Sequence, residues 1–192
     1  HFTSCEVEVT DGAIHVTATD NYGTSYKYYT PKRGIDNIEN FGTKGVSGKF
    51  SNLNSDISID QCYALAEDFG DYYILGMKLW WLYITNDDTR EMLLFELLTP
   101  IDAQSPVGEY SVSANLYKTH LALPGYVTGD GDIWSWYYRE DTDGEVALFA
   151  PIKSGHLSVK SDSNGELAVS FVVKDDKSHT ISGKTTNFTT QE

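Results

Sequence analysis

The chain has 192 residues, of which 40% are hydrophobic, 13% aromatic and 22% charged. This composition argues against a disordered chain, and the length suits about one domain with its own hydrophobic core. Asp and Glu number 28 against 14 for Lys and Arg, so the formal net charge is −14. A surface of this sign repels phosphates, and we therefore expect no nucleic-acid partner.

Short runs of alternating apolar and polar residues, separated by turn residues, predict β-strands along most of the chain. The predicted strands cover residues 6–10, 13–19, 25–30, 61–67, 78–85, 91–99, 108–114, 134–140, 146–152, 156–161, 166–175 and 179–187. Residues 61–67 and 91–99 also fit a helix, but the short turn before 91–99 and the stop at Pro100 favour a strand there. Residues 31–60 read as a long loop or joint, with a short helical turn near 36–41.

Strands that follow one another through short turns pair in the antiparallel sense. The pattern therefore predicts an all-β fold, an antiparallel meander that forms either a β-barrel or a two-sheet β-sandwich. We expect a single domain over 1–192.

Two segments of the chain, one near each end, have similar patterns of alternating residues. They can be laid side by side at an offset of about 150 residues: Val7, Val9, Ile14, Val16 and Asp20 beside Leu157, Val159, Leu167, Val169 and Asp175. Either any two alternating hairpins look alike, or residues 1–50 are an N-terminal half-repeat and 51–192 the main module. In the second case the chain opens with the closing hairpin of one module.

Three segments resemble known proteins: Ala66-Glu-Asp-Phe-Gly-Asp-Tyr-Tyr73, Gly108-Glu-Tyr-Ser-Val112 and Phe149-Ala-Pro-Ile-Lys-Ser-Gly155. Together, over roughly residues 61–187, they resemble β-rich secreted or lipoprotein modules of gut Bacteroidetes, some of which are described as calycin-like or lipocalin-like barrels. The resemblance implies a surface-associated protein of uncharacterised function, and it carries over no catalytic residue.

Aromatic side chains give the strongest indication of a binding site. Trp80 and Trp81 lie on one predicted strand, and alternation places Trp134, Trp136 and Tyr138 on one face of another. Such rings stack on sugar faces or enclose a small apolar ligand, although aromatic residues are also common in sheet cores. We therefore predict a site for a glycan or a small molecule at these five residues.

Acidic residues suggest two further kinds of site. Asp141, Asp143 and Glu145 form an oxygen-rich turn that could bind Ca²⁺, or they are an ordinary hairpin turn. Asp130 and Asp132 form a similar turn nearby. No other cofactor is indicated.

Glu96 is the only charged residue inside an apolar strand. If it points inward, desolvation raises its pKa, as a glycoside hydrolase acid requires; otherwise it faces solvent. The sequence contains none of the common catalytic motifs.

These observations favour a non-catalytic module that binds a ligand or takes part in surface assembly. The alternatives are a glycoside hydrolase or lyase with paired carboxylates, and a purely structural spacer in a larger surface protein. The acidic, Tyr- and Thr-rich composition predicts an extracytoplasmic location: secreted, periplasmic or anchored to the outer membrane. A removed N-terminal lipid anchor would allow peripheral association with the cell surface.

Two readings remain open for the cysteines. Cys5 and Cys62 either form one disulfide or are two free thiols, because sequence alone does not give their separation.

Overall fold

A computed structural model describes residues 2–10, 13–30, 46–73, 75–114, 118–129, 131–162 and 164–185. All the helix or strand structure in these residues is β-strand, which confirms the all-β prediction. The two residues between the predicted strands 6–10 and 13–19, and the helical turn expected near 36–41, lie outside them. The strands are β1 (Phe2–Thr10), β2 (Ala13–Asp20), β3 (Ser25–Thr30), β4 (Ile57–Asp68), β5 (Met77–Asn86), β6 (Glu91–Pro100), β7 (Gly108–Val112), β8 (Leu121–Ala122), β9 (Tyr126–Thr128), β10 (Gly131–Ile133), β11 (Trp136–Glu140), β12 (Val146–Ser161), β13 (Leu167–Asp175) and β14 (Thr180–Thr185).

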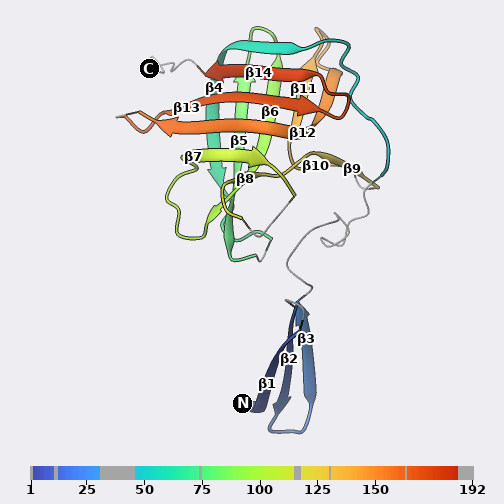
Figure 1. Cartoon of the computed structure of the whole chain (residues 1–192), viewed down its shortest axis with the longest axis vertical. Helices are drawn as coiled ribbons and strands as arrows, with labels where there is room; N and C mark the ends of the chain where they lie inside the picture. Colours follow the sequence, from blue (N-terminus) through green and yellow to red (C-terminus); the bar gives the residue numbers. More distant parts are fainter. Residues whose placement is uncertain are drawn as a thin grey trace.

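The strands form three sheets (Figure 1). Strands β1, β2 and β3 form one antiparallel sheet, here called the N-terminal sheet, and β9 pairs with β10 in a hairpin. The other strands form a nine-stranded main sheet in the order β11-β12-β13-β14-β4-β5-β6-β8-β7, with further pairings of β11 to β6 and of β12 to β7.

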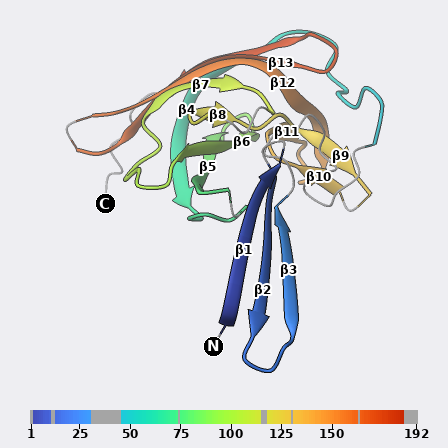
Figure 2. The same cartoon turned by 60° about the horizontal axis from the view of Figure 1, so that its bottom comes forward.

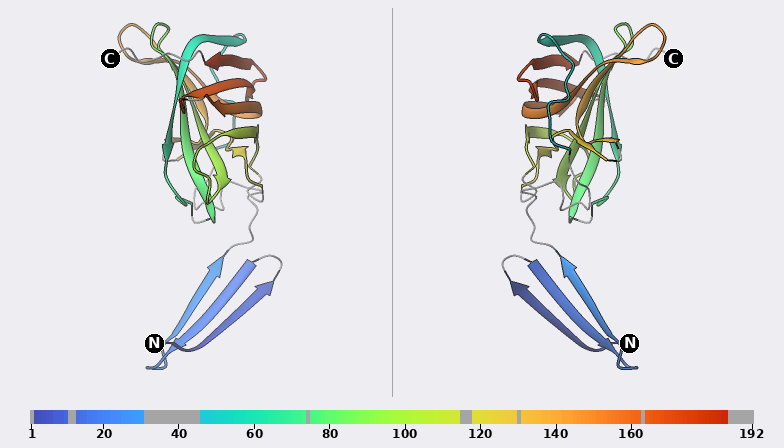
Figure 3. Two further views of the ribbon diagram at one scale, coloured as in Figure 1. Left: turned by 90° about the vertical axis from the view of Figure 1, so that its left-hand side faces the viewer. Right: turned by 90° about the vertical axis from the view of Figure 1, so that its right-hand side faces the viewer.

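The main sheet folds over on itself. Figures 1 and 3 show β12, β13 and β14 lying across β4, β5 and β6, and Figure 2 shows β12 and β13 arching over them. The large core lies between these two groups of strands. It contains Leu82 and Phe95 from one group and Leu157, Phe171 and Ile181 from the other, all at most 2% exposed.

The expectation of purely antiparallel pairing is wrong at two places. β14 pairs with β4 in parallel, and so does β7 with β8. The absence of a side chain at Gly183 allows β14 and β4 to approach closely, because a Cβ at this position would lie 2.4 Å from the carbonyl oxygen of Ile59. β4 and β14 are far apart in the sequence, so local alternation could not reveal that they are neighbours.

Strand β12 joins two predicted strands into one of 16 residues. It continues through Gly155, whose φ of +121° is accessible to glycine and rarely to other residues. A Cβ there would lie 2.4 Å from the carbonyl oxygen of Val172. The residues that had suggested a strand break therefore form a bend within a continuous strand.

Both cysteines are free thiols, and this settles the alternative left open by the sequence. Cys5 is exposed on β1, whereas Cys62 is buried on β4. The Cys62 thiol lies 3.3 Å from the carbonyl oxygen of Lys184, and burial raises its pKa.

None of the described residues forms a helix with the length and apolarity that crossing a membrane requires.

Candidate functional site

An open cavity of about 520 Å³ lies on the face of β5 and β6 that points away from the large core. We call it the aromatic cavity. It collects side chains from the loop before β5, from strands β5 and β6, from the β9–β10 hairpin, and from β11 with the segment just before it. Its lining residues are Tyr72, Tyr73, Trp81, Leu94, Glu96, Asp132, Ile133, Trp134, Trp136 and Tyr138.

Strand register explains how the central side chains come together. Trp81 on β5 is paired directly with Glu96 on β6, and Leu94 is paired both with Tyr83 on β5 and with Trp136 on β11. Directly paired residues in antiparallel strands project from the same face of a sheet. The sheet therefore presents Trp81, Glu96, Leu94 and Trp136 together.

Four of the five predicted ligand-binding residues line this cavity, and Trp80 does not. Trp80 is next to Trp81 on the strand and therefore projects to the opposite face, where it is 7% exposed within the large core. Its indole N–H donates to the hydroxyl of Thr99 at 3.0 Å. The sequence could not place Trp80, because a strand with large side chains on both faces gives no local sign of which face is covered.

Trp134 and Trp136 line the cavity but expose little ring surface to a ligand. They are 3% and 1% exposed, respectively. The Trp136 indole N–H donates to the carbonyl oxygen of Ile133 at 2.8 Å, and Tyr138 is stacked on the Trp136 ring at 5.9 Å between centroids. Trp134 lies just before β11, with a left-handed φ of +69°.

The ring surface that a ligand could reach comes mainly from Tyr72, Trp81 and Tyr138. Tyr72 is 63% exposed, and Trp81 and Tyr138 are half-buried. The Trp81 ring is supported by Phe69, with 4.5 Å between ring centroids. Tyr72 and Tyr73 were not among the predicted binding residues, because they lie in a loop whose path the alternating pattern does not determine.

Glu96 is the most strongly perturbed acid of the cavity. Its side chain points into the cavity and is covered by its neighbours, so that the residue is 6% exposed. The hydroxyl of Tyr73 donates to Glu96 Oε2 at 2.5 Å. Burial raises the pKa of Glu96 from 4.5 to about 7, although the nearby Tyr73 hydroxyl and Trp81 indole act in the opposite direction.

The indole N–H of Trp81 is a buried donor next to this carboxyl. It lies close enough to lower the pKa of Glu96, but it completes no hydrogen bond with any described residue. A buried donor without an acceptor is costly. An acceptor supplied by a ligand would remove that cost.

Asp132 places a second carboxyl in the cavity. The hydroxyl of Tyr138 donates to Asp132 Oδ2 at 3.3 Å. Partial burial raises the pKa of Asp132, and this hydrogen bond lowers it. The lining contains no Lys, Arg or His side chain.

The predicted Ca²⁺ site is not assembled. Asp141 Oδ1 accepts hydrogen bonds from the backbone N–H groups of Asp143 and Glu145, at 2.8 and 3.1 Å, so its carboxylate serves the hairpin turn. Within the described residues, no group of three or more His, Cys, Asp or Glu could hold a metal ion. Asp130, in the other acidic turn, lies outside those residues.

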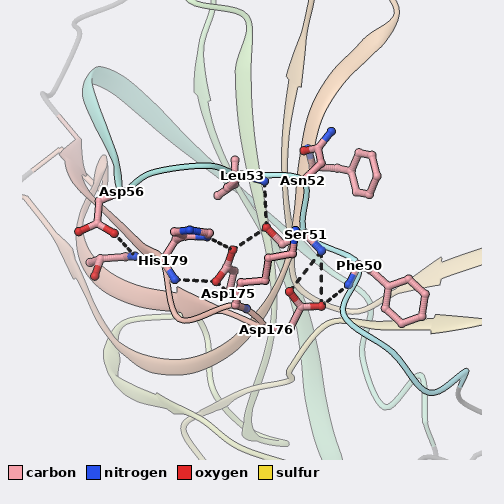
Figure 4. A network of polar contacts seen from close by, with 11 residues as sticks. Phe50, Ser51, Asn52, Leu53, Asp56, Asp175, Asp176 and His179 are labelled. Atoms are coloured by element: carbon pink, nitrogen blue, oxygen red, sulfur yellow. Dashed lines mark hydrogen bonds and ion pairs between the residues drawn. The ribbon is translucent and has the colours of Figure 1, made fainter.

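A Ser, His and Asp also meet at the turn between β13 and β14, away from the cavity (Figure 4). Ser51 donates from Oγ to Asp175 Oδ2 at 2.5 Å, and His179 Nδ1 lies 3.0 Å from the same oxygen. The carboxylate therefore lies between the serine and the histidine, whereas a nucleophilic triad needs the serine on the histidine. This cluster holds residues 50–56 against the β13–β14 turn. Two further hydrogen bonds do the same, from Phe50 N–H to Asp176 and from Thr180 N–H to Asp56.

Comparison of the chain with protein-family models, with curated proteins and with solved structures finds no match.

Proposed function

We propose that the aromatic cavity is a non-catalytic binding site for a neutral carbohydrate. The observation that carries this proposal is the convergence of accessible rings, from Tyr72, Trp81 and Tyr138, with the carboxyls of Glu96 and Asp132 in one open cavity. Aromatic rings stack on the C–H faces of sugars, and carboxyls exchange hydrogen bonds with hydroxyl groups. Because the pKa of Glu96 is about 7, this group can donate as well as accept near neutral pH.

The charge of the site favours a neutral ligand. The lining contains two carboxyls and no basic side chain, and the whole chain carries a formal net charge of −14. Both the carboxyls of the lining and the net charge of the chain would repel an anionic ligand. A purely apolar ligand would leave the Trp81 N–H without an acceptor, and it would give the two carboxyls no hydrogen bonds beyond those from Tyr73 and Tyr138, which disfavours it.

A neutral oligosaccharide array followed by titration with the strongest binder tests this function. We expect Trp81→Ala and Tyr72→Ala each to weaken binding by about tenfold or more, equivalent to about 1.4 kcal/mol. Tyr63→Ala is the matched control, because Tyr63 is an exposed ring on β4 outside the cavity. Absence of any binder, or equal losses in all three folded variants, would reject the proposal.

A glycoside hydrolase is the second candidate, and the raised pKa of Glu96 beside a second carboxyl favours it. Glu96 would act as general acid and Asp132 as nucleophile or base. Incubation of the binder with the native chain and with Glu96→Gln separates the two functions. Cleavage that disappears in the variant supports hydrolysis, whereas binding without cleavage supports the non-catalytic module.

We further propose that the main sheet closes into a barrel. Following the pairings from β11 through β12, β13, β14, β4, β5 and β6 leads back to β11, and this supports closure over a two-sheet sandwich. An extracytoplasmic location with a removed lipid anchor, and a role in surface assembly or as a spacer, remain predictions from the sequence. Protease treatment of intact source cells tests exposure at the surface.

A further inference from the structure

The N-terminal sheet repeats the pairing of the last three strands of the main sheet. The pair Val7–Val16 in β1 and β2 corresponds to Leu157–Phe171 in β12 and β13, with offsets of 150 and 155 residues. With these two offsets, all eight β1–β2 pairs coincide with β12–β13 pairs. With the offset of 155 for both strands, all five β13–β14 pairs coincide with β2–β3 pairs.

The irregularities coincide as well. The β1–β2 register shifts between Phe2 and Ser4, and the β12–β13 register shifts at the equivalent place, between Ile152 and Ser154. Bulges are placed individually in a sheet, so a shared bulge within a shared register distinguishes this match from a chance likeness of two hairpins.

The turns that follow agree atom by atom. Asp20 Oδ1 accepts the backbone N–H groups of Tyr22 and Thr24, and Asp175 Oδ1 accepts those two and four residues after it. Similar turns begin at Asp141 and Asp162, so the turn alone is not specific. The register and the bulge carry the comparison.

What differs is the cover over the apolar face. In the main sheet, Leu157 and Phe171 are each 2% exposed, because β4, β5 and β6 lie beneath them. Their counterpart Val7 is 60% exposed, and Tyr26, which corresponds to the buried Ile181, is 51% exposed.

The edges differ in the same way. β14 is paired with β4 in parallel, and β12 is paired with β7 in the antiparallel sense. Their counterparts β3 and β1 are the two edges of the N-terminal sheet, with no further strand beside them among the described residues. Open edges next to an uncovered apolar face are features that stable proteins normally cover.

We propose that β1, β2 and β3 are the closing unit of a second module of this fold, and that their apolar face and edges dock on strands equivalent to β4–β7. A β4-like strand adds to β3 in parallel, and a β7-like strand adds to β1 in the antiparallel sense. The pairing already present in the main sheet defines this occupant. One local departure is that Cys5 stands where Gly155 bends β12, so the second module lacks that bend.

A tandem protein tests the docking. Residues 46–151 are placed directly before Phe2 of the otherwise intact chain, because Phe2 is the counterpart of Ile152. We expect the backbone amides of β1–β3 to exchange hydrogen at least about a hundredfold more slowly than in the 192-residue chain. A second version carries Val7→Leu, Val16→Phe and Ala18→Val, which restore the side chains found at 157, 171 and 173.

A version of the tandem protein that lacks Val7 is the control. Removing this residue moves the β1 side chains that precede it to the opposite face, away from the partner strands, and it should leave exchange fast. The docking proposal is overturned if the version with restored side chains exchanges as fast as the 192-residue chain, or no more slowly than the control. It is also overturned if β1–β3 are already protected in a dimer of the 192-residue chain, because the occupant is then a second copy.

Discussion

Glu96 could be singled out from the sequence, but its burial could not. A lone acid in an apolar strand pointed to either a buried acid or a solvent-facing one. The structure combines the two, since Glu96 lies on the face away from the core and is nevertheless 6% exposed. Tyr73 in the loop before β5 donates to it, and the β9–β10 hairpin lines the same cavity; alternation predicted the path of neither.

Glu96→Gln should change how stability depends on pH. The folded pKa of about 7 lies above the ordinary value of 4.5, so between these values the folded state holds more protons than the unfolded state. Stability of the native chain should therefore fall as pH rises from 4.5 to 7, by about 1–3 kcal/mol from this group. Urea unfolding at pH 5 and pH 8 should show a smaller fall for Glu96→Gln, and an equal fall would contradict the assignment.

Tyr73→Phe should change the pKa of Glu96 itself. The Tyr73 hydroxyl stabilises the ionised carboxyl by donating to it. Without that hydrogen bond the pKa of Glu96 should rise above its native value. Carbon-13 shifts of the Glu96 carboxyl, followed through a pH titration, measure this, and Tyr63→Phe on β4 serves as the control with no expected effect.

At the scale of elements, hairpins were predictable and long-range pairings were not. The predicted strands at 78–85, 91–99 and 166–175 correspond to β5, β6 and β13 within one or two residues. The short strands β8, β9 and β10 were missed, because segments of two or three residues have no periodicity to detect. The parallel β14–β4 pair was missed because the two strands are far apart in the sequence.

Gly183→Ala should test the importance of that parallel pair. The added Cβ would lie 2.4 Å from a backbone oxygen of β4 and 2.8 Å from the Phe171 ring, so β14 and β4 would have to separate. We expect a loss of about 1–3 kcal/mol in the free energy of unfolding. Gly129→Ala is the matched control, since a Cβ there meets nothing within 4 Å; similar losses in both variants would show that the close approach is unimportant.

For the molecule as a whole, the similarity between residues 7–20 and 157–175 left open whether residues 1–50 are a half-repeat or two hairpins merely look alike. The structure corrects the alignment: in β2 the offset is 155, so Val16 corresponds to Phe171 and not to Val169. The error arose because five residues separate β12 from β13, whereas two separate β1 from β2. Alternation alone cannot detect a shift of two residues, since it leaves every side chain on the same face.

Removing residues 1–45 should leave the main module intact. Neither core cluster among the described residues contains a side chain from β1–β3. We expect the 46–192 chain to unfold at a urea concentration within error of that of the full chain. Fluorescence follows this transition selectively, because all four tryptophans lie in the main module; a clearly lower midpoint would show that the N-terminal sheet supports it.

The placement of the two cysteines has a practical consequence. One thiol lies open to solvent on the N-terminal sheet, and the other is sealed inside the main sheet with a raised pKa. A maleimide dye added to the native protein should therefore attach at Cys5 alone, without any engineered site. Its emission would then report, molecule by molecule, on whatever approaches that sheet.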